Sequence, residues 1–221
     1  MWLLLPLTVI IFILFVAHMN DASEKSAGQR VMEQYLHEKY NADFVVSMPE
    51  RKGSGFGIEG NLESVAYKKG DENLKFIVRT SSKSTNDRYY DAIWGREETA
   101  RLKDIIAAIF GDHVTYSVHM MSTDLSRDDL GGKGSVPPFD EASKKYGQEI
   151  TYYLLITSDA PIHDGNRREV NERIYALFKD MKTDTSLVFH YGYNLSPTDV
   201  YGVSLNQNDV NGLTSANDLN K

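Results

Sequence analysis

The sequence predicts an α+β protein in which an N-terminal transmembrane helix is followed by a soluble domain. In that domain, two strand-helix-strand units contribute to antiparallel or mixed sheets. Three observations lead to this prediction. The 221-residue chain opens with an uncharged stretch at residues 2–19. Short runs rich in β-branched and aromatic residues predict strands. Apolar residues at helical spacing predict the helices between them.

Residues 1–20 are predicted to form the transmembrane anchor. The run WLLLPLTVIIFILFVAHM carries no charged residue, and at ~1.5 Å per residue it reaches ~27 Å, close to the ~30 Å of a bilayer core. A cleaved signal peptide and a buried core helix are the alternatives. The first fits less well, because no Lys or Arg precedes the run and Ala17-His18-Met19 is a poor cleavage site.

The anchor implies a single-pass protein of the cell membrane. Lys25 and Arg30 follow the predicted helix, and the positive-inside rule would place the rest of the chain in the cytoplasm. Asp21 and Glu24 weaken that bias. The chain contains no cysteine, which excludes disulfides and thiolate metal sites and fits an oxidising envelope. We therefore expect an extracytoplasmic domain, with the cytoplasmic side as the alternative.

The first unit is predicted at residues 21–121. Val31, Tyr35, Leu36 and Tyr40 recur at helical spacing and predict an amphipathic N-terminal helix. A β-meander is expected to follow it, and then an aromatic-rich polar loop. The remaining elements are strands at 43–47, 74–80 and 114–120, the loop at 81–95 and a helix at 96–110.

The second β-α-β unit is predicted at residues 148–205, after a Gly/Pro-rich loop at 122–147. It consists of strands at 151–157 and 186–193 around a helix at 168–182. The same order of elements occurs at 74–120, which suggests two related lobes or one duplicated sheet. Residues 206–221 are polar, rich in Asn and Asp, and predicted to be a flexible tail.

The run GSGFGIEG contains the spacing G-x-G-x-x-G at Gly55, Gly57 and Gly60. In a dinucleotide-binding fold, a helix opens directly after these glycines and holds the phosphates at its N-terminus. Here the alternating residues after Gly60 predict a strand. We therefore interpret the glycines as a connection between strands, and predict no cofactor.

Histidines are the main candidates for metal or catalytic chemistry. His119 and His190 lie at corresponding places on two predicted strands, and the fold can bring them together or leave them as ordinary sheet residues. His163 lies just before a helix, where Asp164 or Asn166 is the expected N-cap. The chain has no G-x-S-x-G motif. We therefore assign no catalytic residue.

A calcium-loop spacing occurs near the end of the chain. Oxygen ligands are expected at positions 1, 3, 5 and 12 of such a loop, with glycine at position 6. The matching residues are Gln207, Asp209, Asn211, Gly212 and Asp218. Gln at position 1 lacks the charge and Asp at position 12 is shorter than Glu, so the segment is interpreted as a solvated loop. No metal ligand is predicted.

Tyr89, Tyr90 and Trp94 lie together in the predicted loop DRYYDAIWG. Large aromatic side chains before a helix often fill the core or pack on the helix start. When exposed, they supply the residue types that are enriched at interfaces. These three residues are the candidate contact surface.

Charge limits the partners. Asp and Glu outnumber Lys and Arg by 31 to 24, a net charge of −7. A nucleic-acid-binding protein needs a concentrated basic surface, so nucleic acid is excluded as a partner. The expected partners are the membrane, through the N-terminal helix, and a protein or cell-envelope component.

The segments QYLHEKYNADFVV and DRYYDAIW resemble small anchored or lipid-linked envelope proteins of Gram-positive bacteria. The resemblance spans residues 30–120 and implies a location and a class, without an assigned activity. This chain differs in having no lipid-bearing cysteine. The matching positions are Tyr35, Leu36, Lys39, Tyr40, Phe44, Val46, Asp87 and Tyr89 or Tyr90.

The sequence thus predicts a membrane-anchored, non-enzymatic protein whose soluble α+β domain binds a partner or envelope component. The alternative is a membrane-anchored hydrolase or metal-dependent enzyme with histidines assembled by the fold. Convergence of His119, His163 or His190 in a cleft would favour that enzyme.

Overall fold

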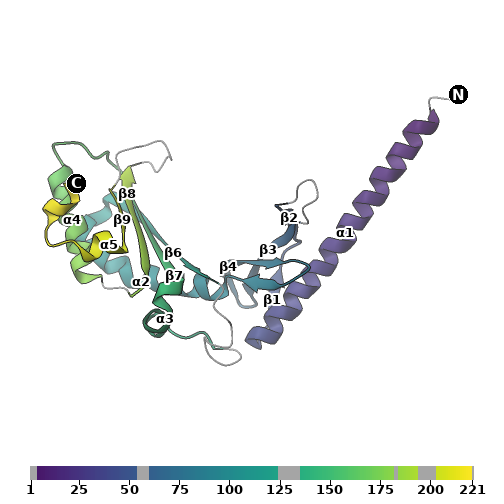
Figure 1. The fold of residues 1–221 in the computed structure, drawn as a ribbon, viewed down its shortest axis with the longest axis horizontal. Helices are drawn as coiled ribbons and strands as arrows, with labels where there is room; N and C mark the ends of the chain where they lie inside the picture. Colours follow the sequence, from purple (N-terminus) through teal and green to yellow (C-terminus); the bar gives the residue numbers. More distant parts are fainter. Residues whose placement is uncertain (1–3, 54–59, 124–134, 182–183, 194–202, 221) are drawn as a thin grey trace. The chain divides into compact units, whose positions relative to one another are not determined.

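A computed structural model describes the chain except for residues 1–3, 54–59, 124–134, 182–183, 194–202 and 221 (Figure 1). The structure divides into two compact units. The N-terminal unit takes Met1–Tyr89 with the short piece Lys133–Ser135, and the C-terminal unit takes Tyr90–Gly132 and Val136–Lys221. Each unit contains its own sheet, so the fold is α+β, as predicted.

The N-terminal unit pairs one long helix, α1 (Leu4–Tyr40), with a five-stranded sheet. Strand β3 is the centre of this antiparallel sheet: β1 and β2 pair with its two ends on one side, and β4 pairs along the other. Gly70, at φ 88°, supplies the left-handed residue of the tight β3–β4 turn. The strands are β1 (Phe44–Val46), β2 (Glu50–Lys52), β3 (Asn61–Lys68), β4 (Asp71–Thr80) and β5 (Thr85–Asp87).

The core of this unit lies between α1 and one face of the sheet. Met32 and Leu36 of α1 are fully buried, as is Val78 of β4. Buried and exposed residues alternate along β3 and β4, which is the pattern of a sheet with one covered face. Figure 1 shows α1 lying along β1, β3 and β4.

The predicted transmembrane helix at residues 1–20 is wrong as a description of this fold. Of the helices in the described part of the chain, none is both long and apolar enough to cross a membrane. In the structure, α1 does not end near residue 20. It continues as one helix to Tyr40 and carries charged side chains, including the pair Asp21–Lys25 at 2.8 Å. Residues 1–3 lie outside the described residues.

The C-terminal unit contains a mixed four-stranded sheet in the order β6-β7-β8-β9. β7 and β8 are parallel and are connected through helix α4, whereas β6 and β9 are antiparallel to their neighbours. The strands are β6 (Val114–Ser122), β7 (Ile150–Ser158), β8 (Ser186–Tyr193) and β9 (Val203–Asn206). The helices are α2 (Tyr89–Phe110), α3 (Phe139–Tyr146), α4 (Arg167–Asp180) and α5 (Gln207–Asn211), with the short 3₁₀ helices η1 (Gly111–His113), η2 (Gly147–Glu149) and η3 (Ala216–Asn220).

Helices α2, α3 and α4 pack on the same face of this sheet. Three aromatic pairs define the contact: Phe110 of α2 with Tyr191, Phe139 of α3 with Tyr152, and Phe178 of α4 with Phe189, at centroid distances of 5.6, 5.8 and 4.8 Å. The strand partners are all buried. The core of the unit therefore lies on one side of the sheet.

The two predicted strand-helix-strand units have different outcomes. The second exists as β7-α4-β8. The first does not, because β4 and β6 belong to different sheets and β6 pairs with β7 instead. The predicted unit at 21–121 is accordingly divided between Tyr89 and Tyr90, and the interpretation as a duplication is wrong.

Three local predictions are also corrected. Helix α2 begins at Tyr89 inside the predicted loop 81–95, where the Tyr89 N–H donates to Asp87 Oδ1 at 2.9 Å. The predicted loop 122–147 contains helix α3, while its residues 124–134 lie outside the described part. The predicted tail 206–221 contains α5 and η3, and a capping box between Asn206 and Asp209 starts α5.

Candidate functional site

The candidate aromatic residues are buried. Tyr89 is 7% exposed and its ring lies 4.7 Å from Tyr40 and 5.1 Å from Phe44. In the C-terminal unit, Trp94 is fully buried, stacks on Tyr90 at 5.7 Å and donates its indole N–H to the Pro137 carbonyl at 2.9 Å. The rings fill cores, so Tyr89, Tyr90 and Trp94 do not form an exposed contact surface in this structure.

Asp87 brings together the residues that carry the sequence resemblance. Its carboxylate accepts hydrogen bonds from the hydroxyls of Tyr35 and Tyr40, at 2.9 and 2.7 Å. It also accepts from the ammonium of Lys39 at 2.7 Å and from the Tyr89 backbone. The Asp87 side chain is only 1% exposed.

These hydrogen bonds compensate the charge of the Asp87 carboxylate, which would be costly to bury without partners. Because Tyr35, Lys39 and Tyr40 belong to α1 and Asp87 ends β5, the cluster fixes the last turns of α1 onto the sheet. The carboxylate has no accessible face for a substrate. The cluster is therefore a structural element of the N-terminal unit.

A second buried carboxylate, Glu98, connects α2 to β7. Arg101 binds it through two nitrogens, at 2.8 and 2.6 Å, and the Tyr152 hydroxyl donates to Glu98 Oε2 at 3.1 Å. Burial, reinforced by the negative charge of Glu98, raises the pKa of the Tyr152 phenol far above its usual range. The hydrogen bond to Glu98 raises the pKa of Arg101. The tyrosine is thus held neutral as a donor.

The candidate histidines do not converge. His119 pairs with Tyr153 in the β6–β7 register, and His190 pairs with Leu155 in the β7–β8 register. Both therefore lie on the sheet face opposite the helices, with the whole of β7 between them. In the described part of the chain, no group of three His, Cys, Asp or Glu residues could hold a metal ion. His163 lies before α4, where its ring nitrogen accepts the Gly165 N–H at 3.1 Å.

We call the sheet face opposite α2, α3 and α4 the open face of the C-terminal unit, because in the described part of the chain these helices pack on the other face. Met121 and Val188 are 50% and 37% exposed there, and Tyr153, Leu155 and His190 are half-buried. Alternation along the strands separates these residues from the core. A partly apolar sheet face that contains a tyrosine has the composition of a contact surface.

At one end of the open face lies a groove of about 820 Å³, which we call the polar groove. Residues of β7, β8, β9 and α5 line it, so segments far apart in the sequence contribute to one site. Thr151, Tyr153, Ser186 and Val188 form its sheet side. Its amide side chains are Gln148, Asn206, Gln207, Asn208 and Asn211.

Gly147 positions one edge of the polar groove. A Cβ atom at this buried glycine would collide with the backbone carbonyl of Asp184. Only glycine allows η2 to pass so close to the segment before β8. Gln148 follows directly, and both Gln148 and Asp184 line the groove.

Gln207 lines the polar groove and carries an unusual buried group. Its Nε2 donates to Asn211 Oδ1 at 2.9 Å. Its Oε1 is buried and has no hydrogen-bond donor in the described part of the structure. Unsatisfied buried acceptors are uncommon in folded proteins and mark positions that call for explanation.

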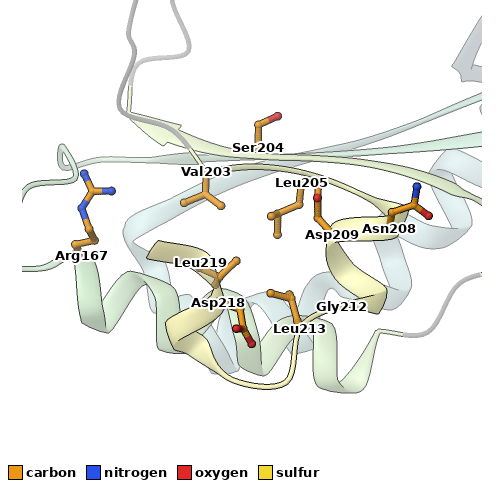
Figure 2. A pocket seen from close by; sticks show the side chains of 10 residues that line it. All are labelled: Arg167, Val203, Ser204, Leu205, Asn208, Asp209, Gly212, Leu213, Asp218 and Leu219. Atoms are coloured by element: carbon orange, nitrogen blue, oxygen red, sulfur yellow. The ribbon is translucent and has the colours of Figure 1, made fainter. Parts of the chain in front are cut away.

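A second cavity, of about 570 Å³, lies between β9, α5, η3 and the start of α4 (Figure 2). In Figure 2, Val203 and Leu205 point from β9 toward Leu213 and Leu219. The carboxylates nearby already have partners: Asp218 Oδ2 accepts from the backbone and hydroxyl of Thr214. This cavity therefore combines an apolar contact with polar lining residues, among them Arg167 and Asn208.

The calcium-like spacing does not form a cation site. Asp209 accepts the Asn206 backbone N–H at 2.8 Å, as part of the α5 capping box. Asp218 instead caps the turn at Thr214 and Ser215. The two carboxylates are used locally, in separate turns.

The glycine motif is followed by a strand. β3 begins at Asn61, directly after Gly60, so the helix that a dinucleotide site requires is not at this position. Gly55 and Gly57 lie outside the described residues.

Comparison with known proteins gives no family for this chain. No family model and no curated protein matches it. Among solved structures, it is similar to the crystal structure of a DUF5037 family protein from Ruminococcus gnavus ATCC 29149, determined at 2.55 Å resolution. The two chains are 12% identical, with a TM-score of 0.41, over 75% of this chain and 74% of the other. No functional argument follows from a likeness at this level, and the resemblance to envelope proteins stays a prediction.

Sequence reasoning missed the polar groove. Its amide residues Asn206, Gln207, Asn208 and Asn211 were assigned to a flexible tail because the segment is polar. The signal that could have identified them is the pattern N-x-x-D at 206–209, which is a helix-capping signature. It indicates an ordered turn that carries exposed amides.

Proposed function

We propose that this chain is a binding protein whose C-terminal unit holds a protein or cell-envelope component with its open face and polar groove. The observation that carries the proposal is the groove of about 820 Å³ at one end of the open face. That volume falls within the range of ligand sites, which run from about 300 to 1,000 Å³. Its sheet side, formed by Thr151, Tyr153, Ser186 and Val188, belongs to strands β7 and β8, and strands position contacts well.

Binding is favoured over catalysis by the arrangement of titratable groups. The enzyme alternative requires histidines that approach one another or a carboxylate in a cleft. His119 and His190 are instead separated by β7. The buried carboxylates Asp87 and Glu98 are occupied by donors from their own units. No specific observation favours a second function.

Photo-crosslinking in the native cell tests this proposal. A photoreactive side chain at Val188, 37% exposed on the open face, is expected to crosslink reproducibly to one component. The matched control is Val65, a valine on β3 that is 39% exposed in the N-terminal unit. Equal labelling from the two positions, or none from Val188, would contradict the proposed binding surface.

A further inference from the structure

We propose that the polar groove binds a neutral carbohydrate chain. This inference rests on the proposed binding function and names the class of ligand for the same site. It is argued from the hydrogen-bonding groups, the charge and the ring surface of the groove.

The hydrogen-bonding groups match those of a sugar. Each sugar hydroxyl both donates and accepts, and amide side chains offer donors and acceptors next to one another. The groove contains five amide side chains, from Gln148, Asn206, Gln207, Asn208 and Asn211. Asn206 Oδ1 already caps α5 and Asn211 Oδ1 already accepts from Gln207, so the remaining amide groups are the ones offered to a ligand. The hydroxyls of Thr151 and Ser186 lie on its sheet side.

The charge of the groove selects against anions. Asp184 is the one carboxylate among the lining residues that the structure describes, and these include no Lys or Arg. Phosphates, nucleotides and acidic sugars are usually held by cationic side chains. The net charge of −7 adds a weak repulsion. A neutral ligand avoids both penalties.

Tyr153 and Val188 provide the surface for a sugar ring. They are neighbours in the β7–β8 register and both line the groove. A tyrosine offers an apolar ring face together with a hydroxyl at its tip. The C–H face of a pyranose can pack on that surface while its hydroxyls reach the surrounding amides.

Gln207 supplies an independent indication. Its Oε1 is a buried acceptor without a donor in the described part of the structure, at a position that lines the groove. Leaving such a group unpaired costs free energy. The oxygen has almost no accessible surface, so a ligand hydroxyl recovers this cost only by shifting the side chain that Asn211 holds at 2.9 Å.

An extended peptide fits the groove less well. Peptides commonly bind sheets by adding a strand at an edge, through main-chain hydrogen bonds. The groove instead lies on the face of β7 and β8, which are paired on both sides, and takes only Asn206 from the edge strand β9. A peptide is therefore an outcome of the test and not the expected ligand.

Titration of the full chain with defined probes, followed by NMR and calorimetry, tests the inference. The probes are neutral hexasaccharides of glucose, mannose and N-acetylglucosamine, with hexagalacturonate as the anionic comparison and an uncharged decapeptide. We expect at least one neutral sugar to bind and to shift amide resonances of β7, β8 and α5. Hexagalacturonate and the peptide should bind more weakly.

Two variants locate the site. Tyr153→Ala removes the ring surface and Gln207→Leu removes the unpaired acceptor, and each should weaken sugar binding about tenfold or more. The matched control is Tyr67→Ala, which removes a half-buried tyrosine from β3 in the N-terminal unit and should leave affinity unchanged. Circular dichroism confirms that each variant is folded.

The outcomes separate this inference from the proposed function. If no neutral sugar binds while Val188 still crosslinks to a component, the carbohydrate inference fails and the binding function stands. If both experiments fail, both proposals fail. Tighter binding of the peptide or of hexagalacturonate, or equal loss of affinity in Tyr67→Ala and Tyr153→Ala, would also overturn the carbohydrate site.

Discussion

At the scale of single residues, Asp87 has the largest expected effect on the N-terminal unit. Its side chain is 1% exposed, and that of Lys39 beside it is 12% exposed. Two charges that are buried this far from water are tolerated because each one compensates the other. The sequence indicated that Tyr35, Lys39, Tyr40 and Asp87 matter together. It could not show their contact, because β5 lies almost fifty residues after α1 in the chain.

Replacing Asp87 with alanine should destabilise the N-terminal unit by about 3–5 kcal/mol, because Lys39 would stay buried without its partner. The matched control is Asp43→Ala. That carboxylate is 63% exposed beside Lys69, and surface ion pairs contribute about 1 kcal/mol or less. Hydrogen exchange of β4 amides measures both changes. If the β4 amides were equally protected from exchange in the two variants, the burial of Asp87 would not determine its contribution to the stability of the N-terminal unit.

At the scale of elements, the Glu98 cluster connects helix α2 to strand β7. The Tyr152 ring is fully buried, and its hydroxyl donates to Glu98 while Arg101 neutralises the carboxylate. The sequence predicted α2 and β7 as separate elements, since their apolar periodicity is local. It could not predict their connection, because a Glu in a helix and a Tyr in a strand are ordinary until the fold places them together.

The pH dependence of stability should report this connection. Burial raises the pKa of Tyr152, and also that of Tyr116. A pKa that is higher in the folded state than in the unfolded state means that the unfolded chain loses the proton first. Stability is therefore complete below about pH 10, the ordinary pKa of tyrosine, and decreases at higher pH.

Above about pH 10, the free energy of unfolding of the C-terminal unit should fall by up to ~1.4 kcal/mol per pH unit for a phenol as deeply buried as Tyr152. Urea unfolding at about pH 9 and pH 11 measures the decrease. Tyr152→Phe should reduce it most, and Tyr116→Phe less, because Tyr116 is only half-buried. An unchanged pH dependence in Tyr152→Phe would be inconsistent with this account.

Element positions were predictable where the signal is local. The strands β7 and β8 and the helix α4 were predicted from alternation and helical spacing, and their parallel pairing follows from the crossover. The start of α2 was missed because Asp87, which accepts the first N–H of the helix, and Asp91, in its first turn, were interpreted as loop residues. Asp91 is in fact buried and accepts two hydrogen bonds from Ser122 at the end of β6.

At the scale of the whole molecule, the chain forms two units with separate cores. Leu36, Ala66 and Val78 are fully buried in the N-terminal unit, and Leu154 and Ile174 in the C-terminal unit. Which strands share a sheet was not predictable, since β6 could have joined either sheet on its apolar pattern alone. Its nine-residue pairing with β7, without a register shift, decides the division.

Separate cores lead to the prediction that the two units unfold independently. Leu36→Ala should destabilise the N-terminal unit by about 2–5 kcal/mol through the cavity it leaves. In a Trp2→Phe background, the fluorescence of Trp94 reports the C-terminal unit alone. Its urea midpoint should not change in Leu36→Ala, but should fall in the matched variant Leu154→Ala, which empties an equally buried position of β7. Hydrogen exchange of the β4 amides reports the N-terminal unit, so it should become faster in Leu36→Ala and stay unchanged in Leu154→Ala. If Leu36→Ala lowers the Trp94 midpoint as much as Leu154→Ala does, unfolding is a single cooperative event, because only a shared transition would transmit the loss of one core to the other.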